Sequence, residues 1–162
     1  VIAAGAEGIY LATVDWGTLD LLTPEEHRQW ARPYDLRLLE AARGEPFNVL
    51  HVCKGRNLLF EMSDYPVSAF SWDANDPTNP GLATALQRLR GAVMGGISFD
   101  ASLGTADSDR FSGEYQRALE ATGGRRWLAA PGCSIPPATS PQNLEAVRDA
   151  VLATRLKETP LS

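Results

Sequence analysis

The sequence has few cysteines and no long apolar run. Two cysteines in 162 residues do not make a disulfide framework, although a single Cys53–Cys133 bridge remains an alternative. No stretch reaches the ~18 apolar residues that cross a bilayer. The first five residues lack the charged region and the apolar core of a secretory signal. We therefore expect a cytoplasmic protein that does not enter a membrane.

Basic residues are also not concentrated anywhere in the chain. The formal net charge is −5 at pH 7, and the 15 lysines and arginines are spread through the sequence. Proteins that follow a phosphate backbone gather such residues on one face. The composition therefore argues against a nucleic-acid partner.

Short apolar runs alternate with longer helical patterns along the whole chain. Strands are predicted at 8–13, 48–53, 69–72, 92–97 and 127–130, and helices at 23–43, 80–90, 107–122 and 140–157, with a short helical turn at 57–64. No hairpin turn separates successive strands, so parallel pairing through helical crossovers is expected. The predicted class is α/β, and both a doubly wound sheet and a (βα)8 barrel fit the pattern.

The first helical pattern carries its own start signal. Thr23 precedes Pro24 and stands three residues before Glu26, which is the spacing of a capping box. Pro33 falls inside the pattern and is expected to kink the helix. His27 lies among charged residues, and its simplest placement is the solvated surface.

Side chains that suit zinc stand at the ends of two predicted strands. His51 and Cys53 close the second strand, and Cys133 follows the fifth. Residues two apart on a strand point to the same face, and imidazole and thiolate are ligands that zinc prefers. We predict a metal site formed by His51, Cys53 and Cys133. The alternative is a buried cysteine beside a hydrogen-bonded histidine.

Other polar and aromatic residues lie at or near the same strand ends, where barrel enzymes build their active sites. Asp15 and Asp73 are candidate catalytic groups, and Ser98 is a candidate substrate contact; helix capping is the alternative for each. Tyr10 and Trp72 are expected in the core or the wall of a substrate pocket.

Six segments, taken in order, resemble the C-terminal half of the uroporphyrinogen decarboxylase superfamily. They are LTPEE at 22–26, RPY at 32–34, LHVC at 50–53, VMGGIS at 93–98, PGCSIPP at 131–137 and PQNL at 141–144. The resemblance implies that residues 1–162 form the C-terminal portion of a TIM (βα)8 barrel, about five of its eight units. It also implies that the family's N-terminal segment, which carries substrate-binding arginines and a catalytic aspartate in true decarboxylases, is absent.

The superfamily contains porphyrinogen decarboxylases and zinc-dependent methyltransferases. In the decarboxylases, the turn after the last strand resembles Gly-His-Gly, whereas this chain has Gly132, Cys133 and Ser134 there. The methyltransferase branch is similar to this chain in having His-x-Cys and a distant Cys, which match His51, Cys53 and Cys133. This resemblance implies an enzyme with Zn²⁺ that moves a methyl group between a corrinoid and a thiol, a small-molecule substrate, and possible contact with a corrinoid protein. Lys54 departs from the glycine usual in that branch.

Two alternatives remain open at this point. The first is a cofactor-free uroporphyrinogen decarboxylase of porphyrin biosynthesis, and the second is a non-catalytic half-barrel. The chain begins at Val1 rather than Met, so a processed or truncated product is expected. The edge of the first strand should then be covered by another copy of the chain or by a missing N-terminal half.

Overall fold

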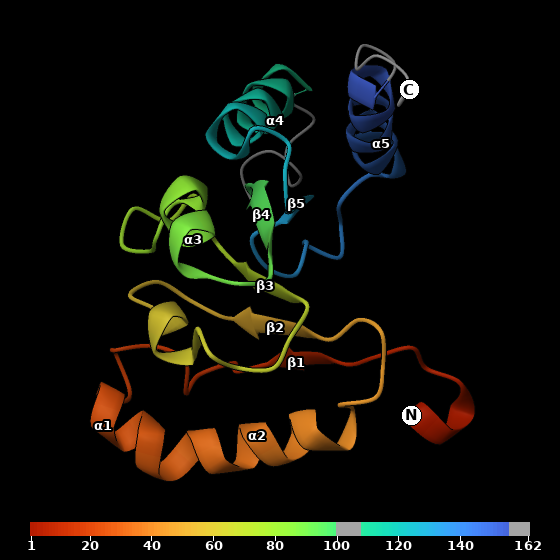
Figure 1. Ribbon diagram of the computed structural model, residues 1–162. Coiled ribbons are helices and arrows are strands. Elements are labelled where there is room, and N and C mark those ends of the chain that lie inside the picture. The colour runs from red at the N-terminus through yellow and green to blue at the C-terminus, as the bar shows by residue number, and fades with distance from the viewer. Residues whose placement is uncertain (100–107, 156–162) are drawn as a thin grey trace.

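Five strands form one sheet, and a helical segment follows each of them along the chain (Figure 1). The computed structural model describes residues 1–99 and 108–155. The strands are β1 (Tyr10–Ala12), β2 (Val49–Val52), β3 (Ala69–Trp72), β4 (Ala92–Ile97) and β5 (Trp127–Pro131). The helices are α1 (Pro24–Glu26), α2 (Arg32–Ala41), α3 (Leu82–Arg88), α4 (Ser108–Thr122) and α5 (Pro141–Arg155), with short helical turns η1 (Ile2–Ala4), η2 (His27–Ala31) and η3 (Leu59–Met62).

All four strand pairings are parallel, and the order in the sheet is β1-β2-β3-β4-β5. Because neighbouring strands run in the same direction, their carboxyl ends share one edge of the sheet. The α/β prediction is confirmed, and the five β/α units form part of a TIM barrel rather than a doubly wound sheet. Among the described residues, β1 pairs only with β2 and β5 pairs only with β4.

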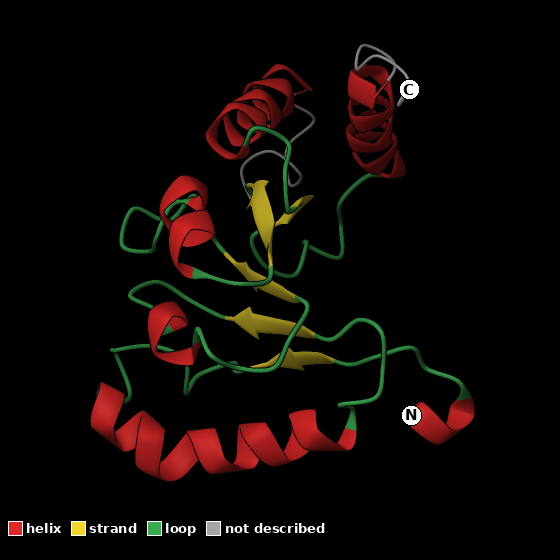
Figure 2. Cartoon of the chain, in the orientation of Figure 1, coloured by secondary structure: helices red, strands yellow, loops and turns green. Residues whose placement is uncertain are grey.

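The two faces of the sheet carry different side chains. Residues Leu50, Val52, Phe70, Trp72 and Val93 are buried in the main hydrophobic core. Figure 2 shows the helices arranged around this outer face of the curved sheet. The inner face carries the alternate residues, and there Tyr10 is 55% exposed and Leu128 is 40% exposed. The outer face thus supplies most of the packing, while the inner face supplies side chains for a site.

The first helical segment begins as predicted and then departs from regular α geometry. The backbone N–H of Glu26 donates to the Thr23 hydroxyl at 3.2 Å, and the Glu26 carboxylate accepts from the Thr23 N–H at 2.8 Å. A π turn at η2 leads into α2, which has Pro33 in its first turn. Proline has no N–H for the carbonyl four residues earlier, so the local hydrogen-bond pattern must change there.

His27 is not on the solvated surface, and that prediction is wrong. Its side chain is 0% exposed and lies with Nε2 3.9 Å from the Asp35 carboxylate, which accepts a 3.0 Å hydrogen bond from Tyr65. Positions 27, 35, 39 and 42 are all buried and form the inner stripe of this segment. The charged residues around His27 occupy the opposite side of the helix and concealed that stripe.

The remaining element boundaries agree closely with the predictions. The third and fourth strands match exactly in their bounds, and the others differ by at most two residues. The end of the last predicted helix, at 156–157, lies outside the described residues. Within the described part of the chain, no helix has the length and apolar character that a membrane crossing needs.

Candidate metal centre

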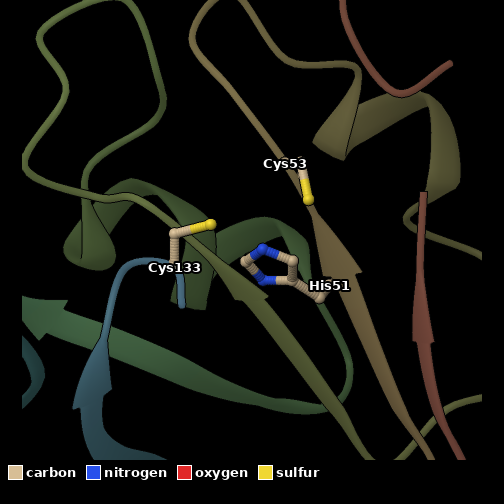
Figure 3. Close-up of side chains that lie close together, drawn as sticks. All are labelled: His51, Cys53 and Cys133. Carbon is tan, nitrogen blue, oxygen red and sulfur yellow. The ribbon is translucent and has the colours of Figure 1, made fainter. Parts of the chain in front are cut away.

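The three predicted ligands meet at the carboxyl edge of the sheet. One nitrogen of His51 and the sulfurs of Cys53 and Cys133 all lie within 4.8 Å of one another. His51 is 4% exposed, and both cysteines are half-buried free thiols, so no disulfide joins them. Figure 3 shows a ring nitrogen of His51 directed toward the two sulfur atoms. One imidazole nitrogen and two thiol sulfurs lying this close together fit the ligand preference of Zn²⁺.

Curvature of the sheet brings these residues together. His51 and Cys53 belong to β2 and its end, whereas Cys133 follows β5, and two strands separate β2 from β5. In a flat sheet three strand spacings amount to about 14 Å. Side chains on β2 and β5 can therefore converge only because the sheet bends around its inner face, as a barrel wall does.

The loop after β1 holds the backbone of the two β2 ligands. The Thr13 N–H donates to the His51 carbonyl at 3.0 Å, and the Thr13 hydroxyl accepts from the Cys53 N–H at 3.4 Å. The backbone of Val14 also hydrogen-bonds the Cys53 thiol. Thr13 had no role in the sequence prediction, in which it was only the last residue of the first strand.

Lys54 adopts the backbone conformation that glycine favours. Its φ of 68° lies in the left-handed region, so the turn after Cys53 forms although a side chain is present. The Lys54 ammonium pairs with the carboxylate of Asp15 at the exposed mouth of the site. Asp15 is therefore near the metal centre, through its contact with Lys54.

Burial sets the ionisation of the ligands. Burial lowers the pKa of His51 and raises the pKa of the Cys53 thiol, and the neighbouring Cys133 raises the Cys53 pKa further. Lys54 acts in the opposite direction on Cys53. Neutral imidazole is the form that binds a metal, whereas the Cys53 thiol, whose pKa is raised, needs a cation beside it to ionise. A divalent ion fits that requirement.

Two residues of the inner face contact the imidazole of His51. The Nδ1 atom of His51 lies 3.1 Å from the Ser71 hydroxyl, and the Tyr10 hydroxyl donates to the same Ser71 oxygen at 3.4 Å. The Tyr10 ring is stacked on the imidazole. Tyr10 was expected in the core or in the wall of a substrate pocket, whereas Ser71 was not among the predicted residues. The available signal was register, because Ser71 pairs with His51 across β2 and β3.

A family model described as uroporphyrinogen decarboxylase (URO-D) matches residues 1–153. The chain belongs to this family. A solved structure of a methyltransferase from Methanosarcina mazei is similar to it, with a TM-score of 0.76 and 26% sequence identity. The likeness covers 95% of this chain and 44% of the methyltransferase, so the chain spans less than half the length of that relative. No curated protein matches the sequence.

Asp73 and Ser98 line a separate cavity in this uroporphyrinogen decarboxylase family member. That cavity measures about 480 Å³ and is also lined by Arg110 and Glu114. The Ser98 N–H donates to the buried Glu114 carboxylate at 2.8 Å. Asp73 accepts from the Asn75 N–H at 3.0 Å, the kind of local turn bond that the capping alternative anticipated.

Of the two places expected for Trp72, the core or the wall of a substrate pocket, the structure shows the core. Trp72 is fully buried in the core, and its indole N–H donates to the Pro80 carbonyl at 2.7 Å. Trp72 pairs with Val52 in the sheet, so its side chain lies on the outer face, opposite to that of Ser71 and His51. It stabilises the helix layer of the family's fold and does not reach the metal ligands.

Proposed function

We propose that this chain carries the metal-binding part of a methyltransferase that moves a methyl group between a corrinoid and a thiol. The observation that supports this function most strongly is the convergence of His51, Cys53 and Cys133 within 4.8 Å. The similarity to the M. mazei methyltransferase supports it as well. The similarity covers 44% of that relative, so we propose that the complete activity also needs parts of the barrel outside this chain.

The residues of the site have separate tasks in this proposal. His51, Cys53 and Cys133 would hold one Zn²⁺ ion, which would offer a place for the substrate sulfur. The bound ion supplies positive charge that keeps a substrate thiol deprotonated near neutral pH. Lys54 adds a second positive charge beside Cys53.

The inner face of the sheet orients the reactants. Tyr10 borders His51 on the inner face and keeps part of the site away from solvent, which strengthens the electrostatic interactions there. In the transfer, a carbon–sulfur bond forms as the bond between the methyl carbon and the corrinoid breaks. The chain contributes alignment of the sulfur with that carbon, and alignment alone is a large part of the rate enhancement in such displacements.

Decarboxylation of a porphyrinogen is the second candidate, because the matching family model carries that description. This reaction needs cationic and acidic groups around several substrate carboxylates. The cavity beside Asp73 offers Arg110 and Arg117 together with Glu114. Decarboxylation has no need of two thiols beside an imidazole, and for this reason we favour the methyltransferase.

Metal analysis of the purified chain tests the proposal directly. The wild-type protein is expected to bind one equivalent of Zn²⁺, and Cys133→Ala is expected to lose at least 100-fold in affinity, because one of three ligands disappears. Dissociation constants from competition with a chromophoric chelator give the comparison, and methylation of a thiol by a methylcorrinoid gives the activity.

Ser134→Ala is the matched control, since it changes the next residue of the same loop without removing a ligand. It should bind zinc as the wild type does. If the wild-type protein binds no stoichiometric zinc and still decarboxylates a porphyrinogen, the methyltransferase proposal fails. Decarboxylation, the second candidate, then replaces it.

A further inference from the structure

The imidazole of His51 has two nitrogens, and only one of them is available to a metal. Nδ1 lies 3.1 Å from the Ser71 hydroxyl, while the ligand cluster lies on the other side of the ring (Figure 3). In a neutral imidazole one nitrogen carries a hydrogen and the other carries a lone pair. The hydrogen bond made by Nδ1 therefore determines whether Nε2 has the hydrogen or the lone pair. The hydrogen bond to Ser71 can therefore determine the tautomer of His51.

We propose that Ser71, assisted by Tyr10, is the positioning residue of the metal centre: its hydroxyl oxygen accepts the Nδ1 hydrogen of His51 and leaves the Nε2 lone pair for the ion. This inference rests on the proposed metal site. It assigns roles to two residues that do not touch the metal themselves.

The surroundings of Ser71 favour an acceptor role for its oxygen. The Tyr10 hydroxyl donates to the same oxygen at 3.4 Å, and a hydroxyl oxygen has two lone pairs, one for Tyr10 and one for His51. The Ser71 oxygen can therefore accept from both side chains at once.

Tyr10 also restricts rotation of the imidazole. The two rings are stacked at 24° with their centroids 5.7 Å apart. Tyr10 lies on β1 and Ser71 on β3, so the Tyr10 side chain reaches across β2 to make its hydrogen bond. The three residues form one unit over neighbouring strands, which fixes both the tautomer and the ring plane of His51. Contacts of this kind typically change metal affinity 10- to about 100-fold when they are removed.

Ser71→Ala tests the acceptor role, because alanine removes the oxygen and keeps almost the same volume in this buried position. We expect zinc affinity to fall by about 10- to 100-fold. Tyr10→Phe keeps the stacked ring and removes only the hydroxyl, so a smaller loss is expected. Ser68→Ala and Tyr34→Phe, which lie outside this unit, should bind zinc as the wild type does.

A spectroscopic readout separates positioning from general damage to the fold. Nitrogen-15 NMR of the metal-free protein at about pH 8, where the ring is neutral, reports which nitrogen of His51 carries the hydrogen. The wild type should show the Nδ1–H form, and Ser71→Ala should shift the population to Nε2–H with unchanged circular dichroism. An Nε2–H wild type, or a Ser71→Ala protein with the tautomer and zinc affinity of the wild type, overturns the inference. A wild type that has the Nδ1–H form but binds no zinc refutes the proposed function and leaves the Ser71 contact established.

Discussion

At the scale of single residues, Lys54 shows how the site tolerates backbone strain. A non-glycine residue in the left-handed region costs roughly 1–2 kcal/mol, which surrounding contacts must offset. The exposed ion pair with Asp15 offsets little of it, since such pairs contribute about 1 kcal/mol at most. Lys54 keeps its strained conformation because the turn that it forms directs Cys53 toward the other ligands.

Lys54→Gly should therefore stabilise the metal-free protein, by up to about 1 kcal/mol after the larger chain entropy of glycine is counted. The ligands should keep their positions, because the turn is the same, while the positive charge beside Cys53 is lost. Denaturant unfolding of the metal-free proteins measures the difference. Lys54→Ala is the matched comparison, because it removes the ammonium but keeps the strain; if it stabilises the protein as much as glycine does, strain is not the cause.

His27 predicts a dependence of stability on pH. Burial, followed by the nearby Arg32, lowers its pKa in the folded protein, and neither ring nitrogen has a hydrogen-bond partner among the described residues. Below about pH 6.5 the unfolded chain binds the proton that the folded chain refuses. Stability is therefore lost as the pH falls through this window.

His27→Leu should reduce that loss by on the order of 1 kcal/mol between neutral pH and about pH 5. Urea unfolding of wild type and variant at both pH values gives the comparison. His51 is present in both proteins and also resists protonation through burial, so its contribution cancels. Equal slopes of stability against pH in the two proteins would show that His27 is not the responsible group.

At the scale of elements, the loop between β1 and α1 controls the end of β2. A Cβ atom at Gly17 would lie 2.2 Å from the Thr13 hydroxyl oxygen and 3.1 Å from Val52. The Thr13 side chain would have to move, and its hydrogen bond from the Cys53 N–H would break. The loop thus needs glycine so that threonine can hold the ligand strand.

Gly17→Ala should cost about 1–3 kcal/mol of stability and weaken zinc binding at the same time. Thermal unfolding and chelator competition measure the two effects. Gly44→Ala is the control, since a Cβ there has no atom within 4 Å. Zinc affinity that stays unchanged in Gly17→Ala would separate the loop from the metal centre.

Strands were predictable from the sequence because those of a parallel sheet, covered on both faces, appear as continuous apolar runs. The convergence of His51, Cys53 and Cys133 was predictable because they are rare residue types at strand ends. The face on which a side chain lies was harder, because it reverses with each residue and depends on neighbouring elements. For that reason Trp72 was left between the core and a pocket wall, Ser71 was overlooked, and the buried stripe containing His27 was missed.

At the scale of the whole molecule, the candidate metal ligands come from distant parts of the sheet. Cys53 follows β2 and Cys133 follows β5, so an ion bound by both connects strands that are not neighbours. The contacts that now hold this curvature are the strand pairings and the helix layer. A bound ion adds a direct connection across the concave side, where Tyr10 and Leu128 remain exposed.

Zinc should accordingly stabilise the entire sheet. A ligand that binds only the folded state at 100 times its dissociation constant adds about 2.7 kcal/mol, which raises the melting temperature by roughly 5–10 °C in a chain of this size. Hydrogen exchange should slow in both β2 and β5, because the ion can form its full set of bonds only when the two strands are in place. In Cys133→Ala, zinc should leave the exchange of β5 unchanged and raise the melting temperature far less. Protection confined to β2 in the wild type would mean that His51 and Cys53 bind the ion without Cys133, and the connection across the sheet would not exist.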